Sequence, residues 1–298
     1  MLDKLEFLIA LARERHFRRA AEQCGVTQPT LSAGIKHLEE SLGAPLVNRG
    51  SRYVGLTPEG ERVLLWARQI TGDARAMRQE VETLRRGVSG TIRLAVIPTA
   101  LPIAARLCGD LTDRHPGVRF SIQSASSKAI LGMIEDFVID GGLTYLDNEP
   151  LPRMETAPIY QEGYRLVTQA DGRFAGRTEV AWGELSGLPL CLFTPDMQNR
   201  RIVDQTLAQY GGGAPGDCTE TNSSLVMAAL VSSGRWHSIM PPALIEAVAL
   251  APSVVHLPIV DPQITHAVGL VVAEREPQTP LVRALVAGAR RLGEKMAL

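Results

Sequence analysis

The feature that most constrains this chain is a regular apolar repeat in a long segment without proline. Between Pro58 and Pro98 there is no proline, and apolar residues recur at alternating spacings of four and three residues. The repeat consists of Val63, Ala67, Ile70, Ala74, Met77, Val81 and Leu84. A mean period of 3.5 residues is typical of a coiled-coil seam. We therefore expect one helix over residues 58–86, about 43 Å long at a rise of about 1.5 Å per residue. Its apolar seam would pair with a second copy of the chain, although a core helix of the C-terminal domain is an alternative.

Three shorter helices are expected before this segment. Residues 2–14 carry one apolar stripe, and a second helix should cover residues 18–23. Gly25 then provides a tight turn, Thr27 is a good N-cap, and a third helix should follow over residues 28–42. Two helices joined by a short turn form the arrangement that places a recognition helix in the major groove of DNA.

The third of these helices has two different faces. Projected at 100° per residue, Leu31, Ile35, Leu38 and Leu42 share one side. The opposite side carries Pro29, Thr30, Ala33, Lys36 and His37, with Ser32 at its edge. Small and polar side chains opposite a core stripe allow a helix to enter the major groove, whereas bulky ones would hold it out. Periodicity alone, however, fits an ordinary amphipathic helix equally well.

The segment after the third helix predicts a wing. Residues 46–57 form two short strand patterns around a Gly-Ser-Arg tip, and they carry Arg49, Ser51 and Arg52. Arginine side chains on a hairpin next to a recognition helix can pair with DNA phosphates.

A family resemblance becomes specific at this point. It is carried by Phe17-Arg18-Arg19-Ala20-Ala21, Thr27-Gln28-Pro29-Thr30-Leu31-Ser32, Ile35, Leu38-Glu39, Leu42-Gly43, Pro45-Leu46, Arg49, Leu56-Thr57 and Gly60. With these residues the first sixty positions resemble the DNA-binding head of the LysR-type transcriptional regulators. The resemblance implies a mainly α winged helix-turn-helix head, double-stranded DNA as a partner, and a homodimer or homotetramer.

The pattern and the resemblance together predict which residues contact DNA. They are Arg18, Thr27, Gln28, Pro29, Thr30, Ser32, Ala33, Lys36, Arg49, Ser51 and Arg52. Two positions depart from the family. Ala33-Gly34 replaces a common Arg-Gln pair, and Val47 replaces a common Phe. The first departure removes a donor for bases or phosphates, so the sequence preference of relatives cannot be transferred to this chain.

From residue 91 onwards the pattern changes to alternating strands and helices. Strands are expected over 91–97, 118–124, 141–145, 164–168, 189–193, 238–240, 254–257 and 267–273. Helices are expected over 101–114, 127–137, 199–210, 223–233, 242–248 and 278–295. Such βα alternation indicates parallel sheets covered on both faces.

The resemblance continues through this C-terminal part with weaker motifs, including His115-Pro116-Gly117-Val118, Asp140 and Leu230-Val231-Ser232-Ser233-Gly234. It implies an α/β two-lobed domain similar to periplasmic binding proteins, with a small-molecule effector in the cleft. One lobe would contain residues 91–162 and 268–298, and the other residues 163–267. The implied domains are a head over 1–57, a linker helix over 58–87 and a regulatory domain over 88–298.

Four segments are candidates for the effector site because each places hydroxyl groups at the start of a helix, where free N–H groups favour anions. They supply Pro98, Thr99 and Ala100; Ser126, Ser127 and Lys128; Thr194 and Pro195; and Asn222 and Ser223. For any single Ser or Thr taken alone, an ordinary N-cap is the better explanation. The conjunction of four such segments predicts a small anionic or carboxylate effector. Trp236 stands where relatives often carry a second glycine, so we also expect an unusually small cavity, although a structural packing role for this indole is an equal alternative.

Composition sets the remaining limits. Residues 1–90 carry a net charge of +3 and the rest −4, which fits a chain whose head alone approaches a polyanion. No apolar stretch is long enough for a membrane span, and the acidic N-terminus does not look like a secretory signal, so we expect a cytoplasmic protein. The sequence contains no HExxH, GxSxG or Walker motif, and its histidines lack metal-ligand spacing. We therefore expect neither an enzyme nor a cofactor.

Two alternatives to a ligand-sensing regulator stay open. Cys191 and Cys218 could form a redox-sensing pair within the same architecture. A free solute-binding protein would explain the C-terminal part, but it would leave the head and the apolar repeat unexplained.

Overall fold

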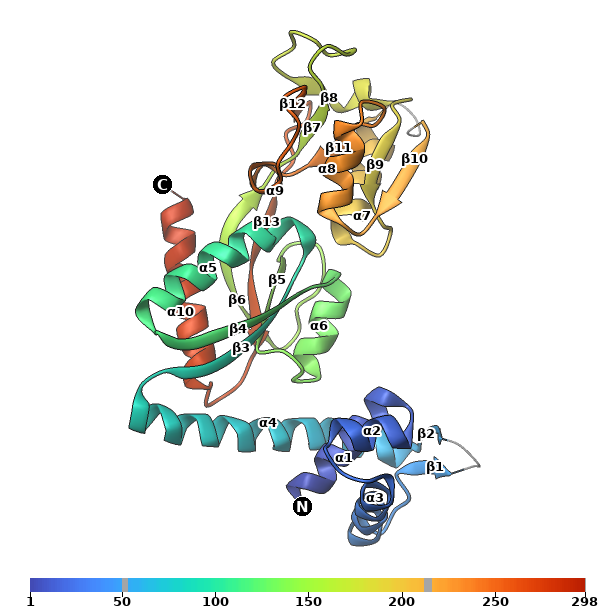
Figure 1. The fold of residues 1–298 in the computed structure, drawn as a ribbon, viewed down its shortest axis with the longest axis vertical. Coiled ribbons are helices and arrows are strands. Elements are labelled where there is room, and N and C mark those ends of the chain that lie inside the picture. The colour runs from blue at the N-terminus through green and yellow to red at the C-terminus, as the bar shows by residue number, and fades with distance from the viewer. Residues whose placement is uncertain (50–52, 212–215, 298) are drawn as a thin grey trace. The chain divides into compact units, whose positions relative to one another are not determined.

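The computed structural model describes residues 1–49, 53–211 and 216–297, and it divides the chain into two compact units. The first unit covers Met1–Arg85 and the second covers Arg86–Leu298. Figure 1 shows the helical first unit and the α/β second unit. Among the residues described, no helix has the length and apolar character that crossing a bilayer requires.

The first unit confirms the helices predicted for the head. It contains α1 (Leu2–Glu14), α2 (Phe17–Gln23) and α3 (Gln28–Leu42), followed by the hairpin of β1 (Val47–Arg49) and β2 (Tyr53–Leu56). The three helices bury one core, to which α1 contributes Leu8 and Leu11 and α3 contributes Leu31, Ile35 and Leu38. The predicted apolar stripe of the third helix is therefore its buried face. Leu42, which the projection placed with them, is an exception because it is 48% exposed.

The hairpin is fixed to the helices by polar contacts at its base. The Glu39 carboxylate of α3 accepts hydrogen bonds from the backbone N–H groups of Leu46 (2.9 Å) and Val47 (3.1 Å). Gly60 lies so close to this segment that a Cβ there would be 2.0 Å from the Leu46 carbonyl oxygen. Thr57 caps the following helix by accepting a hydrogen bond from the Gly60 N–H at 2.9 Å. These contacts explain why Glu39, Thr57 and Gly60 all occur in the sequence pattern of the head, because together they fix the base of the hairpin.

The long helix α4 (Pro58–Arg86) forms without interruption, as the proline-free segment predicts. Its N-terminal half joins the head core through Leu64 and Ala67, which are buried. Further along, Ile70, Met77, Val81 and Leu84 of the predicted seam are 42%, 65%, 54% and 82% exposed. The seam therefore carries solvent-exposed apolar side chains in the single chain.

The second unit contains two lobes. Lobe I is built on a five-stranded sheet with the order β4-β3-β5-β13-β6. Its strands are β3 (Ser89–Val96), β4 (Gly117–Ser124), β5 (Gly141–Tyr145), β6 (Met154–Glu162) and β13 (His266–Ala273). Helices α5 (Leu101–Arg114) and α10 (Pro280–Met296) cover one face and α6 (Ser127–Glu135) covers the other. Two glycines at the start of β5 allow the helices on both faces to pack closely against the sheet. A Cβ at Gly141 would meet Leu285 of α10, and one at Gly142 would meet Ile130 of α6.

Lobe II contains a four-stranded sheet with the order β11-β7-β12-β8 and the parallel pair β10-β9. Its strands are β7 (Arg165–Gln169), β8 (Val180–Ala181), β9 (Leu190–Phe193), β10 (Cys218–Thr221), β11 (Ser238–Met240) and β12 (Val254–Val260). Its helices are α7 (Gln198–Tyr210), α8 (Ser224–Ser232) and α9 (Pro242–Ala247), and short 3-10 turns occur at η1 (Pro98–Ala100) in lobe I and η2 (Trp182–Leu185).

The structure corrects two sequence expectations. The sheets are mixed rather than parallel, because β13 runs antiparallel to β5 and β6, and β11 and β12 run antiparallel to β7. In addition, β6, β8 and β10 were not predicted. Residues 154–162 include Pro158 and lack a clean alternation of polar and apolar residues, which hid the longest strand of lobe I. The strands that pass between the lobes account for the antiparallel pairing.

Candidate nucleic-acid interface and effector cleft

The exposed face of α3 carries most of the residues predicted to contact DNA. Gln28, Pro29, Thr30, Ala33 and Lys36 are exposed, whereas Ser32 is half-buried. Thr27 is the N-cap of the helix, and its hydroxyl accepts a hydrogen bond from the Thr30 N–H at 3.4 Å. This cap leaves the first turn of α3 pointing into solvent with short side chains, which is the shape that a major groove admits.

Two of the predicted cations, Arg18 and Lys36, have weak partners in the head. Arg18 on α2 is exposed and forms a 3.0 Å ion pair with Glu22, and Lys36 lies 3.8 Å from Glu40. Exposed pairs of this kind contribute little stability, so phosphate oxygens can replace these carboxylates at little cost. Arg49 ends β1 of the hairpin. Ser51 and Arg52 lie outside the residues that the structure describes.

Packing explains one residue of the Ala33-Gly34 departure from the family, namely Gly34. The Phe7 ring of α1 covers Gly34, and a Cβ there would be 2.6 Å from that ring. A longer side chain at this position would therefore require Phe7 to move. Ala33 is exposed and presents only a methyl group to the solvent.

The second unit contains one small cavity between the lobes, and of the four predicted effector segments only the first reaches it, through Pro98 and Thr99. The cavity has a volume of about 10 Å³, which is about the space for one water molecule. Its walls are Ile97, Pro98, Thr99 and Tyr145 from lobe I, and Phe193, Met197, Gln198 and Asn199 from lobe II. The position at the carboxyl ends of strands β3, β5 and β9 is where open α/β sheets bind ligands.

Several groups in this cavity can bind a ligand. The buried Thr99 hydroxyl reaches the Glu162 carboxyl, and its hydrogen bond lowers the pKa of that group, whereas the Gln198 side-chain oxygen is buried without a hydrogen-bond partner in the described structure. Helix α7 begins at Gln198 behind Met197, whose side chain cannot cap the free N–H groups of the first turn. Unused donors at a helix N-terminus favour an anion.

The other predicted effector residues lie elsewhere, and within the described chain none of them lines this cavity. Ala100 is buried at the end of η1, and Ser126 is the N-cap of α6. Ser127 donates to Glu149 at 3.4 Å, and Lys128 is exposed. Ser223 caps α8 by accepting from the Val226 N–H at 3.4 Å. Finally, Thr194 is half-buried, and Pro195 and Asn222 are exposed.

A buried carboxyl group lies next to the cavity. Glu162, at the end of β6, is 1% exposed, and its two oxygens accept hydrogen bonds from the hydroxyls of Tyr145 and Tyr160. Asn199 in turn donates to the Tyr145 hydroxyl at 3.3 Å. Burial raises the pKa of Glu162 to about 7, although the two tyrosine hydrogen bonds act in the opposite direction. Both protonation states of this carboxyl are therefore accessible near neutral pH.

Three contacts join the lobes around this cluster. Asn199 of α7 reaches Tyr145 of β5, and Arg201 of α7 forms a 2.5 Å ion pair with Glu149 of lobe I. On α5, Arg106 lies 3.6 Å from Glu246 of α9. The N-terminal turn of α7 thus both lines the cavity and holds lobe II to lobe I.

Trp236 does not cause the small cavity. Its indole packs against the core around Met227 and Val231 in lobe II, and the Arg235 guanidinium lies 5.3 Å from its ring centroid. The cavity is small because Tyr145, Phe193 and Met197 fill the space between the lobes. The expectation of a small cavity is confirmed, but the residue named as its cause was wrong.

The two cysteines considered as a redox pair lie on neighbouring strands but on opposite faces. In the parallel pair of β9 and β10, Cys218 lies opposite Leu190, whereas Cys191 lies opposite Thr219. Because side chains alternate along a strand, Cys191 and Cys218 project to different sides of the sheet. Both are free thiols, and burial raises the pKa of Cys191 to about 11 and that of Cys218 above its ordinary value. Neither a disulfide nor a reactive thiolate is favoured here.

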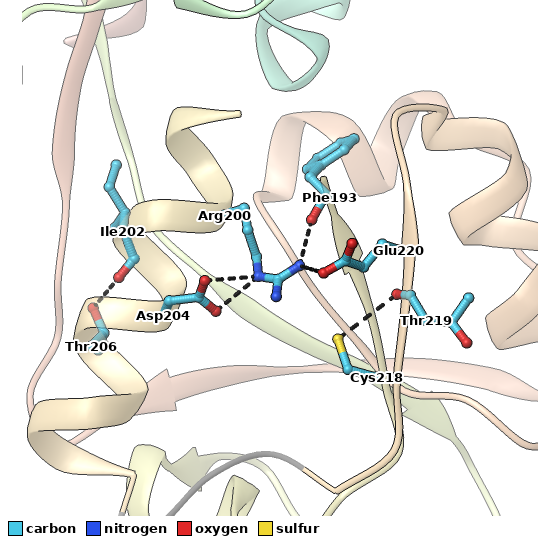
Figure 2. Close-up of polar contacts among 8 residues, drawn as sticks. All are labelled: Phe193, Arg200, Ile202, Asp204, Thr206, Cys218, Thr219 and Glu220. Carbon is cyan, nitrogen blue, oxygen red and sulfur yellow. Dashed lines mark hydrogen bonds and ion pairs between the residues drawn. The ribbon is translucent and has the colours of Figure 1, made fainter. Parts of the chain in front are cut away.

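Figure 2 shows what holds α7 to these strands. The Arg200 guanidinium contacts both carboxylate oxygens of Asp204 (2.8 and 2.9 Å), the Phe193 carbonyl oxygen (2.8 Å) and Glu220 (2.9 Å). Its side chain is only 11% exposed. Cys218 lies beside this network, with its Sγ 4.0 Å from the Thr219 carbonyl oxygen.

Sequence reasoning missed the cavity residues that come from strand ends rather than from hydroxyl-rich helix starts. These are Ile97, Tyr145, Phe193, Met197, Gln198 and Asn199, together with Glu162 behind them. The sequence pattern could have identified Tyr145, because this residue ends a predicted strand and the ends of strands line such clefts. No local pattern singles out Glu162, because its partners lie on other elements.

Two family models match the chain. The model described as "Bacterial regulatory helix-turn-helix protein, lysR family" matches residues 2–61. The model described as "LysR substrate binding domain" matches residues 85–293.

Similar proteins and structures cover nearly the same length. The chain is 28% identical over 276 residues to the DNA-binding transcriptional dual regulator OxyR of Escherichia coli (strain K12), spanning 92% of this chain and 89% of that protein. It is 30% identical over 249 residues to a probable hydrogen peroxide-inducible genes activator of Streptomyces viridosporus, spanning 80% and 77%. Full-length OxyR from Pseudomonas aeruginosa has a similar fold, with a TM-score of 0.76, 24% identity and 97% coverage of both chains. CbnR in complex with its target DNA follows with a TM-score of 0.66, 21% identity, and coverage of 98% of this chain and 99% of that one.

Proposed function

This chain belongs to the LysR family of transcriptional regulators, and we propose that it is a homo-oligomeric regulator that reads a specific double-stranded DNA sequence through α3. The observation that carries this proposal is the exposed face of α3, where Gln28, Pro29, Thr30, Ala33 and Lys36 follow a capped turn. The hairpin cations Arg49 and Arg52 are assigned to the phosphate backbone, together with Arg18. CbnR, which has a similar fold, has been solved in complex with its target DNA.

Two copies of the chain are proposed to pair along α4. The exposed seam residues Ile70, Met77, Val81 and Leu84 support this pairing, because an apolar stripe on a helix is stabilised when a second helix covers it. A dimer would place two copies of α3 on neighbouring grooves, and a tetramer would pair two such dimers. The domain limits that we propose are 1–57 for the head, 58–87 for the linker and 88–298 for the regulatory domain.

The regulatory domain is proposed to bind a small anionic effector in the cavity between its lobes. The uncapped N-terminus of α7, whose first residues line the cavity, supports an anion. An effector that binds one lobe arrangement better than another shifts the population towards that arrangement, which alters how paired heads meet DNA. We propose that the protein acts by binding alone, in the cytoplasm where the chromosome is accessible, rather than by catalysis.

A peroxide-sensing version of this function is suggested by the names of the relatives. The Streptomyces viridosporus relative is named as a probable hydrogen peroxide-inducible genes activator. In this chain, however, Cys191 and Cys218 project to opposite faces and their pKa values are raised. Ligand binding is therefore the better supported mode of regulation.

The proposal is tested by selecting DNA from a random double-stranded pool with the purified protein, with and without a panel of small organic acids. We expect an enriched motif with two related half-sites. The Lys36→Ala variant should bind this motif more weakly, whereas Arg177→Ala, which removes an exposed cation of lobe II, should bind normally. Absence of any enriched motif at low ionic strength would contradict the assignment.

A further inference from the structure

The cavity between the lobes has no cation in its walls to balance an anionic effector. Its eight lining residues, all described by the structure, are apolar, aromatic, hydroxyl or amide residues. Two ionisable groups are hydrogen-bonded to its walls. The Tyr145 hydroxyl donates a hydrogen bond to Glu162, and Arg200 donates to the Phe193 carbonyl oxygen while it also binds Asp204 and Glu220. Because two carboxylates already offset the charge of Arg200, Glu162 is the group whose change of charge can balance an anion in this cavity.

The hydrogen bonds around Glu162 have a fixed direction when the carboxyl is ionised. Asn199 donates to the Tyr145 hydroxyl, the Tyr145 hydroxyl donates to Glu162, and Tyr160 donates to the other carboxylate oxygen. Since the carboxyl is 1% exposed, water does not screen its charge. Two negative charges on either side of Tyr145 would repel each other strongly, whereas a protonated Glu162 removes the repulsion.

Other charged or titratable groups lie near this carboxyl, and the experiment has to distinguish their effects from the titration of Glu162. His266 of β13 is its direct partner across the sheet, and its ring contacts the rings of Tyr145 and Tyr164. His266 also lies 3.3 Å from Asp147. Arg201 and Glu149 pair at the lobe contact. A groove between α5, α9 and α10 is lined by Glu162 together with Tyr160, Arg106, Glu246, Arg290 and Glu294. Within this described set, Glu162 is the carboxyl that is both buried and hydrogen-bonded to a cavity residue.

We propose that an anionic effector binds in this cleft, with the lobes further apart than around the one-water cavity described above, together with one proton, which the Glu162 carboxyl takes up from solvent. The effector keeps its charge, and the only covalent change is the new O–H bond on Glu162. Because the pKa of Glu162 is raised by burial to about 7, the proton is already present on most molecules below neutral pH and has to be acquired above it. This inference rests on the proposed effector function of the cavity and adds its coupling to pH.

The experiment measures the affinity of the full-length protein for formate, the smallest carboxylate, by titration calorimetry between about pH 5.5 and about pH 8.5. Formamide serves as a neutral molecule of nearly the same shape. We expect the formate affinity to be constant on the acidic side and to fall about tenfold per pH unit above neutrality, as binding linked to one proton requires. The heats in two buffers with different ionisation enthalpies should show uptake of about one proton on the alkaline side. Formamide affinity should not follow this pattern.

Three variants test whether Glu162 is the group that takes up the proton. Glu162→Gln should bind formate with an affinity independent of pH and without proton uptake. Tyr160→Phe removes a donor to the ionised carboxylate from outside the cavity, so the fall in affinity should begin at a higher pH. His266→Asn should leave the pH profile in place. If Glu162→Gln fails to fold, the pH profile of Tyr160→Phe and the number of protons taken up by the wild type still show whether Glu162 is the group that binds the proton.

The inference is overturned if formate affinity is flat with pH, if the dependence persists in Glu162→Gln, or if His266→Asn abolishes it. It is also overturned if formate does not bind to the wild type at any pH, because then no anion occupies the cleft. DNA selection with the same preparation tests the regulator assignment separately, so failure of the effector site and failure of the DNA-binding function can be told apart.

Discussion

Replacing Glu162 by glutamine should make the stability of the ligand-free protein less dependent on pH. The folded protein holds the proton on this carboxyl more tightly than the unfolded chain does, because burial raises the pKa from 4.5 to about 7. Stability from this group is fully present below the unfolded pKa of 4.5 and is lost as the pH rises through about 7. At about 1.4 kcal/mol per pKa unit, the loss for wild type amounts to about 3 kcal/mol. Glutamine is neutral throughout and should lose nothing over the same range.

The assay is thermal unfolding of both proteins at about pH 4 and about pH 8.5, compared as a difference of differences so that other titrating groups cancel. For a domain of this size, about 3 kcal/mol corresponds to a shift in Tm of about 6–12 °C. The wild type should therefore lose about that much more than Glu162→Gln between the two pH values. Equal losses in the two proteins would refute the reasoning, because they would mean that Glu162 ionises in the folded state as easily as in the unfolded chain.

Four further outcomes follow from the described contacts. Arg18→Ala should weaken binding to all DNA sequences and reduce the salt slope by about one, and an unchanged slope would remove Arg18 from the phosphate contacts. Met77→Glu should shift the oligomer towards monomer in sedimentation, whereas Gln69→Glu, which adds the same charge outside the seam, should not; equal effects would contradict the seam. Arg200→Ala should destabilise the regulatory domain by about 2–3 kcal/mol in thermal unfolding, less than for a fully buried network because its carboxylate partners are partly exposed. Peroxide treatment followed by peptide mass spectrometry should yield no disulfide between Cys218 and the cysteine of β9, and its appearance in most molecules would restore the redox-sensing alternative.

The sequence predicts the head well because its information is local. The buried stripe of α3, the cap at Thr27 and the turn at Gly25 all depend on neighbours within a few positions. The apolar repeat of α4 is equally local, and its length follows from the absence of proline. Here periodicity, capping and turn chemistry point to the same structure, which is the condition under which sequence patterns are reliable.

The regulatory domain was predicted less completely because its decisive features are not local. Strand β6 contains Pro158 and pairs with β13, more than a hundred residues away, so its pattern looked irregular. Tyr145, Glu162 and Asn199 meet only after three separate elements have packed together. The hydroxyl groups at helix starts were visible in the sequence, but Ser223 turned out to cap its own helix. A side chain that caps its own helix and one that awaits a ligand look the same in a sequence.

Helix α7 connects the cavity to the rest of lobe II through consecutive residues that face different partners. Asn199 and Arg201 contact Tyr145 and Glu149 in lobe I, while Arg200 between them fixes the helix to β9 and β10. A helix held this way cannot tilt towards lobe I without moving the strands to which Arg200 is bonded, because packed elements shift as units. For the proposed effector function, Arg200 is the residue that ties the cavity-lining turn of α7 to β9 and β10, so Arg200→Ala should reduce the effect of an effector on DNA binding more than it reduces effector binding.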